Sequence, residues 1–200
     1  LGRVIEEPIS AALSVGEESI NAYLASDGHL KLWAWLGLIF LKTHLKDKQR
    51  RVHADSRLGD QKIADEYDWP ALHHIHSVVR AIINGYSIDG HTIGSILIWP
   101  IVTNYSAETF DYMDLHVAQT IFIRVGSLGL FTVFNDSGAV LNTFRQKLDK
   151  IDGPLSELQA REILVELAWL NLHIVERPTH ATYYDLMAEK CWIGTKLPDL

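Results

Sequence analysis

The chain has 200 residues, of which 48% are hydrophobic and 22% charged, and its formal net charge is −7. This length fits one domain, and the composition is that of a globular protein rather than a disordered one. The negative charge argues against a protein that coats nucleic acid over its whole surface, although a local basic patch can still bind phosphates.

Cysteine content and hydropathy set the expected compartment. Cys191 is the single cysteine, so the chain forms no internal disulfide and no zinc site built on cysteines. This favours a reducing, cytoplasmic location. The longest apolar run, residues 32–41, is shorter than the roughly 18–20 residues that cross a bilayer, so no membrane partner is expected. The first residues show no signal-peptide pattern, and the start at Leu1 rather than Met predicts a piece of a longer protein.

The N-terminal part of the chain is expected to be helical. Residues 1–27 are interpreted as an N-terminal helical linker, with a short helix at residues 14–25. Ser14 can cap that helix, and Glu17 stands three residues further on, as a capping box requires. Residues 30–45 are apolar almost all round, which is typical of a helix that is buried on every side.

A basic segment follows this helix. Residues 42–57 hold six lysines and arginines against two aspartates, and residues 49–59 lack periodicity and are expected to form a loop. One interpretation is a solvated helix end whose cations suit the helix dipole. The other is a patch that contacts the phosphates of nucleic acid. The candidate nucleic-acid-binding residues are Lys46, Arg50, Arg51 and Arg57.

The next predicted helix, residues 71–84, begins after Pro70 and carries a histidine-rich stretch, HHIH. His73 and His76 are three residues apart and share a helix face, as two metal ligands would. No carboxylate stands between them, and no third ligand has a suitable spacing. Ordinary surface side chains are therefore the favoured interpretation, and no metal site is assigned.

Residues 120–139 are predicted to form the centre of the fold as two strands joined by a tight turn. Residues 121–125 and 131–134 are mostly β-branched or aromatic, which fits a pleated and buried surface. Gly126-Ser127 suits a two-residue hairpin loop. Because nearly every position is apolar, both faces of the hairpin are expected to be covered.

The remaining elements complete an α+β fold. Residues 94–102 form a third predicted strand, in which Pro100 marks an edge, a bulge or the strand end. Helices are predicted at residues 139–150, 156–173 and 183–192, the second with Leu158, Ile163, Leu167 and Leu170 on its buried side. We expect a single domain over residues 1–200: a small, mostly antiparallel sheet with a central hairpin, covered by several helices.

Four acidic or imidazole side chains near the hairpin are weak candidates for catalysis. Asp111, Asp114 and His116 cluster within six positions, and Asp136 stands at the far end of the hairpin. Carboxylates beside strand ends can hold Mg²⁺ or act as acid and base. The competing interpretation is that Asp111 and Asp114 cap a turn, which is a common use of aspartate.

The order of these elements resembles the region behind the nuclease motif in bacterial and phage HNH-type endonuclease proteins. In that family a CxxCN sequence precedes a short acidic segment, similar to LGRVIEEP at residues 1–8. A helix like LKLWAWLGLIFLKTHL at 30–45 comes next, then an FDYxD stretch, here FDYMD at 110–114. A strand pair ending in DGGA-like residues follows, here NDSGA at 135–139, before PLSELQAREILVELA at 154–168.

The chain departs from that family where HNH chemistry takes place. The HNH fold needs a hairpin followed by a helix that carries a metal-ligating His or Asn, with a general-base His on the preceding strand. Residues 140–150 contain Asn142 but no histidine, and the chain has no CxxC pair. The resemblance therefore implies that the nuclease part, with any divalent metal, lies upstream of Leu1, and that this segment needs no cofactor.

Three functional hypotheses remain open. The first is an accessory domain of an HNH-type endonuclease-like protein that positions nucleic acid or senses a partner. The second is a metal-dependent hydrolase that uses Asp111, Asp114 and His116, with Asp136 as a further candidate. The third is a protein-interaction domain without chemistry of its own.

Overall fold

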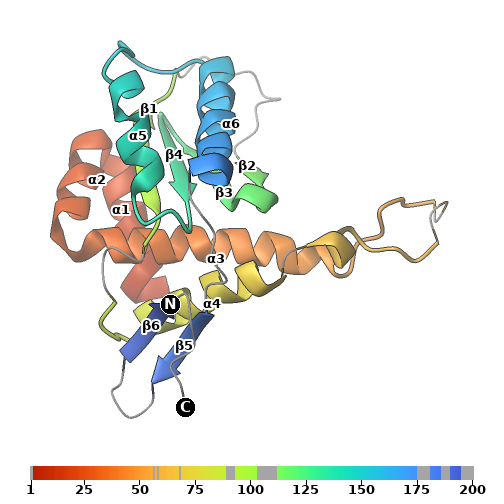
Figure 1. Cartoon of the computed structure of the whole chain (residues 1–200). Coiled ribbons are helices and arrows are strands. Elements are labelled where there is room, and N and C mark those ends of the chain that lie inside the picture. Colours follow the sequence, from red (N-terminus) through yellow and green to blue (C-terminus); the bar gives the residue numbers. More distant parts are fainter. Residues whose placement is uncertain are drawn as a thin grey trace.

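The computed structural model of the chain is an α+β fold, in which a four-stranded sheet lies between two groups of helices (Figure 1). This confirms the fold class expected from the sequence. The residues that the structure describes are 2–55, 57, 59–67, 69–88, 93–102, 112–174, 181–185 and 190–194.

The sheet is antiparallel throughout. Its strands are β1 (Ser95–Pro100), β2 (Tyr112–Leu115), β3 (Thr120–Val125) and β4 (Leu128–Val133), in the spatial order β1-β4-β3-β2. The predicted central hairpin is β3 and β4, joined by Gly126 and Ser127, with Gly126 at a φ of 60°. The predicted third strand is the edge strand β1, and Pro100 ends it. Proline has no backbone N–H to donate to a neighbouring strand, so the end of an edge strand is a position that tolerates it.

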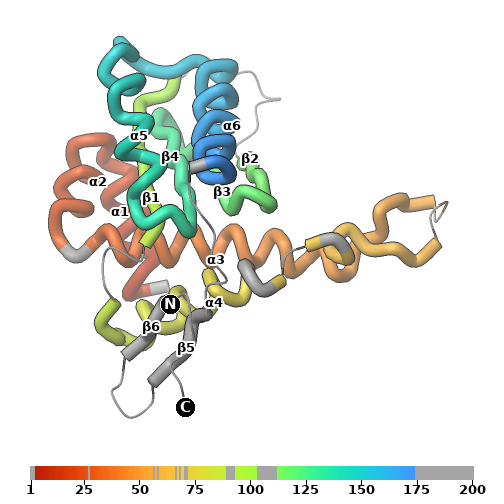
Figure 2. The backbone as a smooth tube through the Cα atoms, viewed as in Figure 1, coloured from red at the N-terminus to blue at the C-terminus, as the bar shows by residue number. Residues whose placement is uncertain are grey.

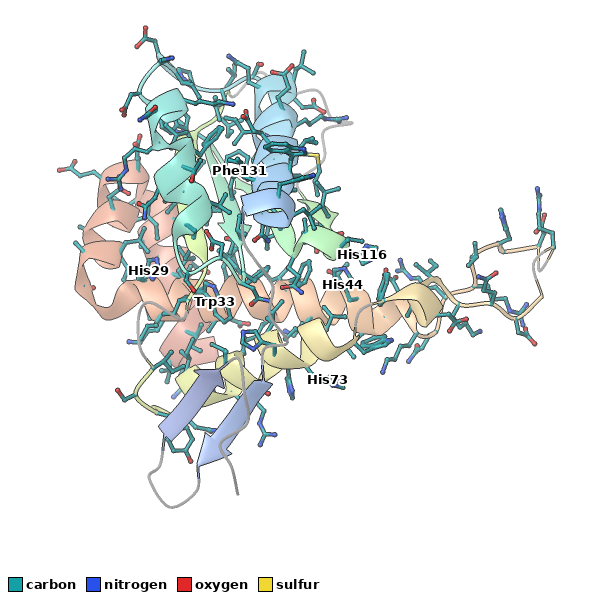
Figure 3. The ribbon with its side chains drawn as sticks, viewed as in Figure 1. His29, Trp33, His44, His73, His116 and Phe131 are labelled. Atoms are coloured by element: carbon teal, nitrogen blue, oxygen red, sulfur yellow. The ribbon has the colours of Figure 1, made fainter. Side chains whose placement is uncertain are left out.

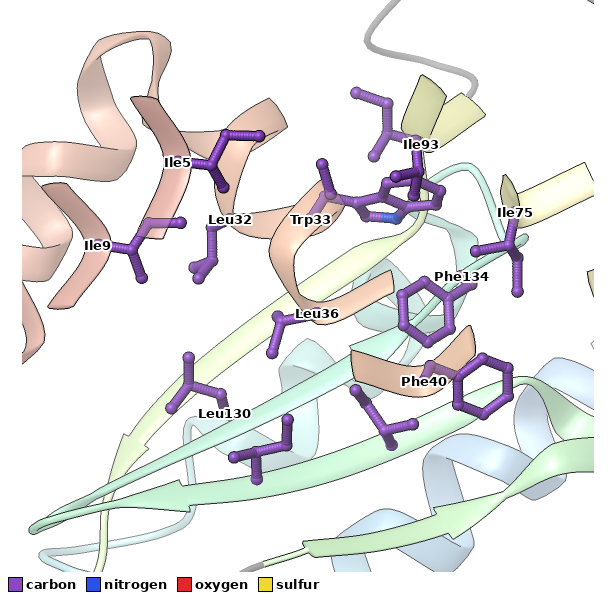
Figure 4. Close-up of a cluster of buried hydrophobic side chains, with 14 of the residues drawn as sticks. Ile5, Ile9, Leu32, Trp33, Leu36, Phe40, Ile75, Ile93, Leu130 and Phe134 are labelled. Atoms are coloured by element: carbon purple, nitrogen blue, oxygen red, sulfur yellow. The ribbon is translucent and has the colours of Figure 1, made fainter. Parts of the chain in front are cut away.

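One face of the sheet packs against helix α3 (His29–Asp47), as the close-up in Figure 4 shows. Phe134, just after β4, lies at the centre of this core. Its ring centroid is 5.5 Å from that of Trp33 and 4.9 Å from that of Phe40, and all three side chains are buried. The apolar run at 30–45 forms a helix, as predicted, but it is not buried on every side: Lys42 is exposed and Leu45 is 50% exposed.

The opposite face of the sheet packs against α5 (Ala139–Leu148) and α6 (Glu157–Ile174). Phe122 on β3 and Phe131 on β4 meet there, with ring centroids 4.8 Å apart. Both faces of the hairpin are therefore covered, as expected. Leu158 on α6 was predicted to be buried but is 65% exposed, because the buried stripe of the helix begins at Ala160.

The N-terminal residues form α1 (Glu7–Val15) and α2 (Glu17–Tyr23), flanked by the π-helical turns η1 (Gly2–Glu6) and η2 (Leu24–Gly28). Their apolar side chains join the core of α3, through Ile5, Ile9, Ala12, Leu13 and Ile20. The predicted Ser14 cap is wrong. Ser14 lies inside α1 and donates a hydrogen bond to the Ala11 carbonyl at 2.8 Å, while Gly16, at a φ of 120°, separates the two helices.

Helix α4 (Trp69–Ile83) packs against α3. It begins one residue before Pro70, which suits the first turn of a helix, as predicted. The two helices approach closely at Gly37, where an added Cβ would lie 3.0 Å from Val79 Cγ2. The apolar side of α4, including Leu72, Ile75 and Val79, is buried in the α3 core.

The described residues between 48 and 62 belong to an arm that extends away from the body of the molecule (Figures 1 and 2). Two backbone hydrogen bonds join its outgoing and returning strands: Val52 N–H to the Gln61 carbonyl at 3.0 Å, and Ile63 N–H to the Arg50 carbonyl at 3.1 Å. The chain returns through the 3₁₀ turn η3 (Ile63–Glu66). A second such turn, η5 (His116–Ala118), follows β2.

The last described elements are two paired strands, β5 (Ala181–Asp185) and β6 (Lys190–Gly194). The helix predicted at residues 183–192 is therefore wrong. Thr182, Tyr183, Tyr184 and Trp192 all favour strands, and this local preference prevails over the helical pattern. Among the described residues, no helix has the length and apolar character that crossing a membrane requires.

Candidate nucleic-acid interface

The four predicted phosphate-contacting residues lie on one projecting part of the molecule. Lys46 is in the last turn of α3, and Arg50, Arg51 and Arg57 are on the arm. All four are exposed. From Lys46 to Lys62 the sequence holds six lysines and arginines against three aspartates, in a chain whose total charge is −7.

Two of these arginines are ion-paired within the arm. Arg51 lies 3.1 Å from Asp60, and Arg57 lies against Asp55, with which it forms several hydrogen bonds. The Arg57 guanidinium lowers the pKa of Asp55, and the carboxylate in turn raises the pKa of Arg57. Exposed ion pairs of this kind are weak and are screened by salt, so a phosphate can replace either carboxylate.

A cluster of polar rings and carboxylates joins the base of the arm to the sheet. Asp114 lies within β2, not in a turn, and its Oδ1 is 3.8 Å from Nε2 of His44 on α3. His44 is buried, and its Nδ1 donates to the Phe40 carbonyl at 2.7 Å. Asp114 therefore faces the central helix, so the turn-capping interpretation does not hold for it.

His116 and Tyr67 complete this cluster. The ring of His116 is 5.9 Å from His44 and 4.6 Å from Tyr67, and Figure 3 shows the two histidines on facing elements. Burial, followed by the nearby His44, lowers the pKa of His116. Tyr67 donates its hydroxyl proton to Asp47 at 2.6 Å, and burial with this bond raises its pKa. We call His44, Asp47, Tyr67, Asp114 and His116 the polar cluster.

Asp136 is separated from the polar cluster and has a structural role. It is buried and accepts hydrogen bonds from Ser95 N (2.7 Å), Ser95 Oγ (2.6 Å) and Val140 N (2.9 Å). It thereby fixes the start of α5 to β1. Strands β1 and β2 are opposite edges of the sheet, three strand spacings of about 4.8 Å apart, so Asp136 and Asp114 do not converge.

The hydrolase candidates are thus only partly brought together. Asp114 and His116 are close to one another, Asp136 is elsewhere, and Asp111 lies outside the described residues. Across the described part of the chain, no three His, Cys, Asp or Glu side chains gather in a group that could hold a metal ion.

A small pocket at the base of the arm was not predicted from the sequence. Its volume is about 170 Å³, and its described lining residues are Leu41, Leu45, Lys48, Trp69, Leu72, His73 and His76. Lys48 Nζ lies 3.8 Å from the centre of the Trp69 ring. The spacing of Leu41, Leu45 and Lys48 along α3 and its C-cap could have indicated a shared face. Trp69 joins these residues only in the folded chain.

The comparisons with known proteins give no relative. No protein-family model, no curated protein and no solved structure matches the chain. The resemblance to the region behind an HNH nuclease motif therefore stays a prediction.

Proposed function

We propose that this chain is a module that contacts the phosphates of nucleic acid through its projecting arm, as an accessory part of an HNH-type endonuclease-like protein whose cutting segment lies elsewhere. The observation that supports this most is the gathering of exposed cations on the arm and on the last turn of α3 beside it, Arg50 and Lys46 above all, in a chain that is otherwise acidic. Among the described residues, these two have no recorded ion pair with a carboxylate.

The shape of the arm suits this role. A projecting basic element can follow a phosphate backbone while the acidic body stays away from it, since like charges repel. Such contacts fix register and contribute affinity without reading sequence. The polar cluster joins the base of the arm to the edge of the sheet, so the arm has a fixed root on the body.

The direct test is a binding titration of the full chain with fluorescently labelled DNA and RNA, followed by anisotropy, first at low ionic strength and then with rising salt. We expect binding at low salt that weakens steeply and linearly on a plot of log K against log salt, because each phosphate contact releases counterions. Equal affinities for unrelated sequences are also expected.

A second candidate is the protein-interaction domain, and the exposed side of α6 favours it. Leu158, Val165, Trp169 and Leu172 are 65%, 58%, 54% and 45% exposed and follow one helix face. Together with Glu162, these residues are separated alternately by four and by three positions. This is the spacing of the contact positions in two paired helices. The occupant that this spacing fits is a second copy of α6, antiparallel about a two-fold axis near Val165.

The oligomeric state tests this second candidate. Light scattering after size-exclusion chromatography should give a dimer that Val165→Glu converts to monomer. A mass of 22.6 kDa for the unmodified chain at all concentrations would exclude the dimer.

A further inference from the structure

We infer that the pocket at the base of the arm binds one unpaired base of a single-stranded nucleic acid, stacked on Trp69, with the adjoining phosphate held by Lys48, His73 and His76. This inference rests on the proposed function and deepens it, because it names single strands rather than duplexes as the preferred ligand. The arm supplies phosphate contacts along the backbone, and the pocket adds a contact to a base.

The first argument is the shape of the pocket. Leu41, Leu45 and Leu72 provide an apolar surface, and Trp69 provides an aromatic one. A volume of about 170 Å³ lies below the ~300–1,000 Å³ of pockets for drug-sized ligands. The pocket therefore suits a single ring system rather than a whole cofactor.

The second argument is that the aromatic surface is held in place. The Trp69 indole N–H donates to the Ala64 carbonyl at 3.2 Å, which fixes the ring relative to η3. The ring of Tyr67 lies 6.0 Å away, and Tyr67 is itself bound to Asp47. A ring fixed in this way loses little freedom when a base stacks on it. Lys48 Nζ lies over the Trp69 ring, 3.8 Å from its centre, so a base that stacks on that face displaces Lys48 toward the adjoining phosphate.

The third argument is the charge at the rim. Lys48 from the end of α3 and His73 and His76 from α4 are the ionisable groups among the described lining residues, and none is acidic. Burial, then Arg80 and His73, lowers the pKa of His76. Because Lys48 is positively charged and no described lining residue is acidic, the rim favours an anion over a cation.

The fourth argument is continuity with the arm. Lys48 belongs both to the pocket and to the arm, and Lys46 and Arg50 lie two residues to either side of it. A backbone that follows the arm would thus bring a base to Trp69. In a duplex that base is already stacked and paired, and its extrusion costs free energy. The pocket therefore discriminates against duplexes without reading a sequence.

The test compares a labelled 12-nucleotide oligothymidylate with a duplex of the same length, using the full chain at low salt. We expect tighter binding of the single strand, and Trp69→Ala should weaken that binding about 5- to 150-fold, the equivalent of the ~1–3 kcal/mol that stacking of one base contributes. Duplex binding should change less than about twofold. Trp69→Phe should retain most of the affinity, because phenylalanine also stacks.

Two further variants separate the pocket from general effects on folding. Leu45→Trp fills the pocket from its exposed rim and should also weaken single-strand binding while Trp69 stays in place. Trp99→Phe changes a tryptophan on β1, the sheet edge opposite to β2, and should leave binding unchanged. Melting curves of all variants confirm that each is folded.

The outcomes distinguish this inference from the proposed function. Equal binding of single strand and duplex, unaffected by Trp69→Ala but sensitive to salt, would overturn the base pocket and leave the arm as the contact. Equal weakening of both ligands by Trp69→Ala would also overturn it, because Trp69 would then only support the arm. No binding of either ligand at low salt would overturn both.

Discussion

Tyr67 and Asp47 close the base of the arm, with the tyrosine hydroxyl 2.6 Å from the aspartate Oδ2 across twenty residues of sequence. Tyr67→Phe removes a hydrogen bond to a charged group and should lower the free energy of unfolding by about 1–2 kcal/mol. Urea denaturation measures this. Tyr23→Phe is the matched control, because the buried Tyr23 hydroxyl has no described hydrogen-bond partner and its removal should be close to neutral. Equal effects of the two variants would mean that the Tyr67–Asp47 bond contributes nothing.

Phe134 should be among the most sensitive core positions. It is fully buried between Trp33 and Phe40, so Phe134→Ala should cost about 3–5 kcal/mol of stability through lost contacts and a cavity. Trp169→Ala, at a side chain that is 54% exposed on α6 and stacks on His173, should cost much less than Phe134→Ala. Denaturant unfolding of both variants checks the contrast, and a small effect of Phe134→Ala would contradict the described core.

His116 should make stability depend on pH. Burial and then His44 lower its pKa below the ordinary value of 6.5, while Asp114 and Asp47 act in the opposite sense. The unfolded chain then binds more protons here than the folded chain. The stability that the neutral His116 contributes is therefore fully present above about pH 6.5, and it is lost as the pH falls through the folded pKa. Between pH 7.5 and pH 5.5 the free energy of unfolding of His116→Gln should fall less than that of the unmodified chain. An equal fall in both chains would contradict this account.

A divalent metal should not stabilise the chain. A ligand that binds only the folded state raises the melting temperature, and among the described residues the candidate Asp136 is held by Ser95 and Val140, away from Asp114. We expect unchanged melting when Mg²⁺ or Mn²⁺ is added. A clear rise that disappears in Asp114→Asn would favour the hydrolase hypothesis instead.

The elements that could be predicted from sequence are those whose signal is local. The central hairpin follows from the near-continuous run of β-branched and aromatic residues on either side of Gly126-Ser127, and helix α3 follows from the mostly apolar stretch at residues 30–45. The break at Gly16 and the strand pair at residues 181–194 were missed. In both cases a competing local signal, the possible Ser14 cap or the short helical pattern at residues 183–192, indicated a different structure.

The sites depend on contacts that sequence does not report. Asp136 is bound by Ser95, which is 41 residues away, so its structural role emerges only with the sheet. Lys48 and Trp69 meet because the arm returns to its starting point. The basic character of the arm was readable from composition, but the pairing of Arg51 with Asp60 was not.

The measurement that tests the central claim most directly is the salt dependence of nucleic-acid binding by Arg50→Ala/Arg51→Ala. Loss of two phosphate contacts should flatten the slope of log K against log salt by roughly 1.4–1.8, since each contact contributes about 0.7–0.9. Binding should weaken about equally on any sequence. The control, Arg145→Ala/Lys150→Ala on the exposed side of α5 and the turn after it, should keep the original slope. An unchanged slope in the arm variant, or no binding by the unmodified chain at low salt, would contradict the account.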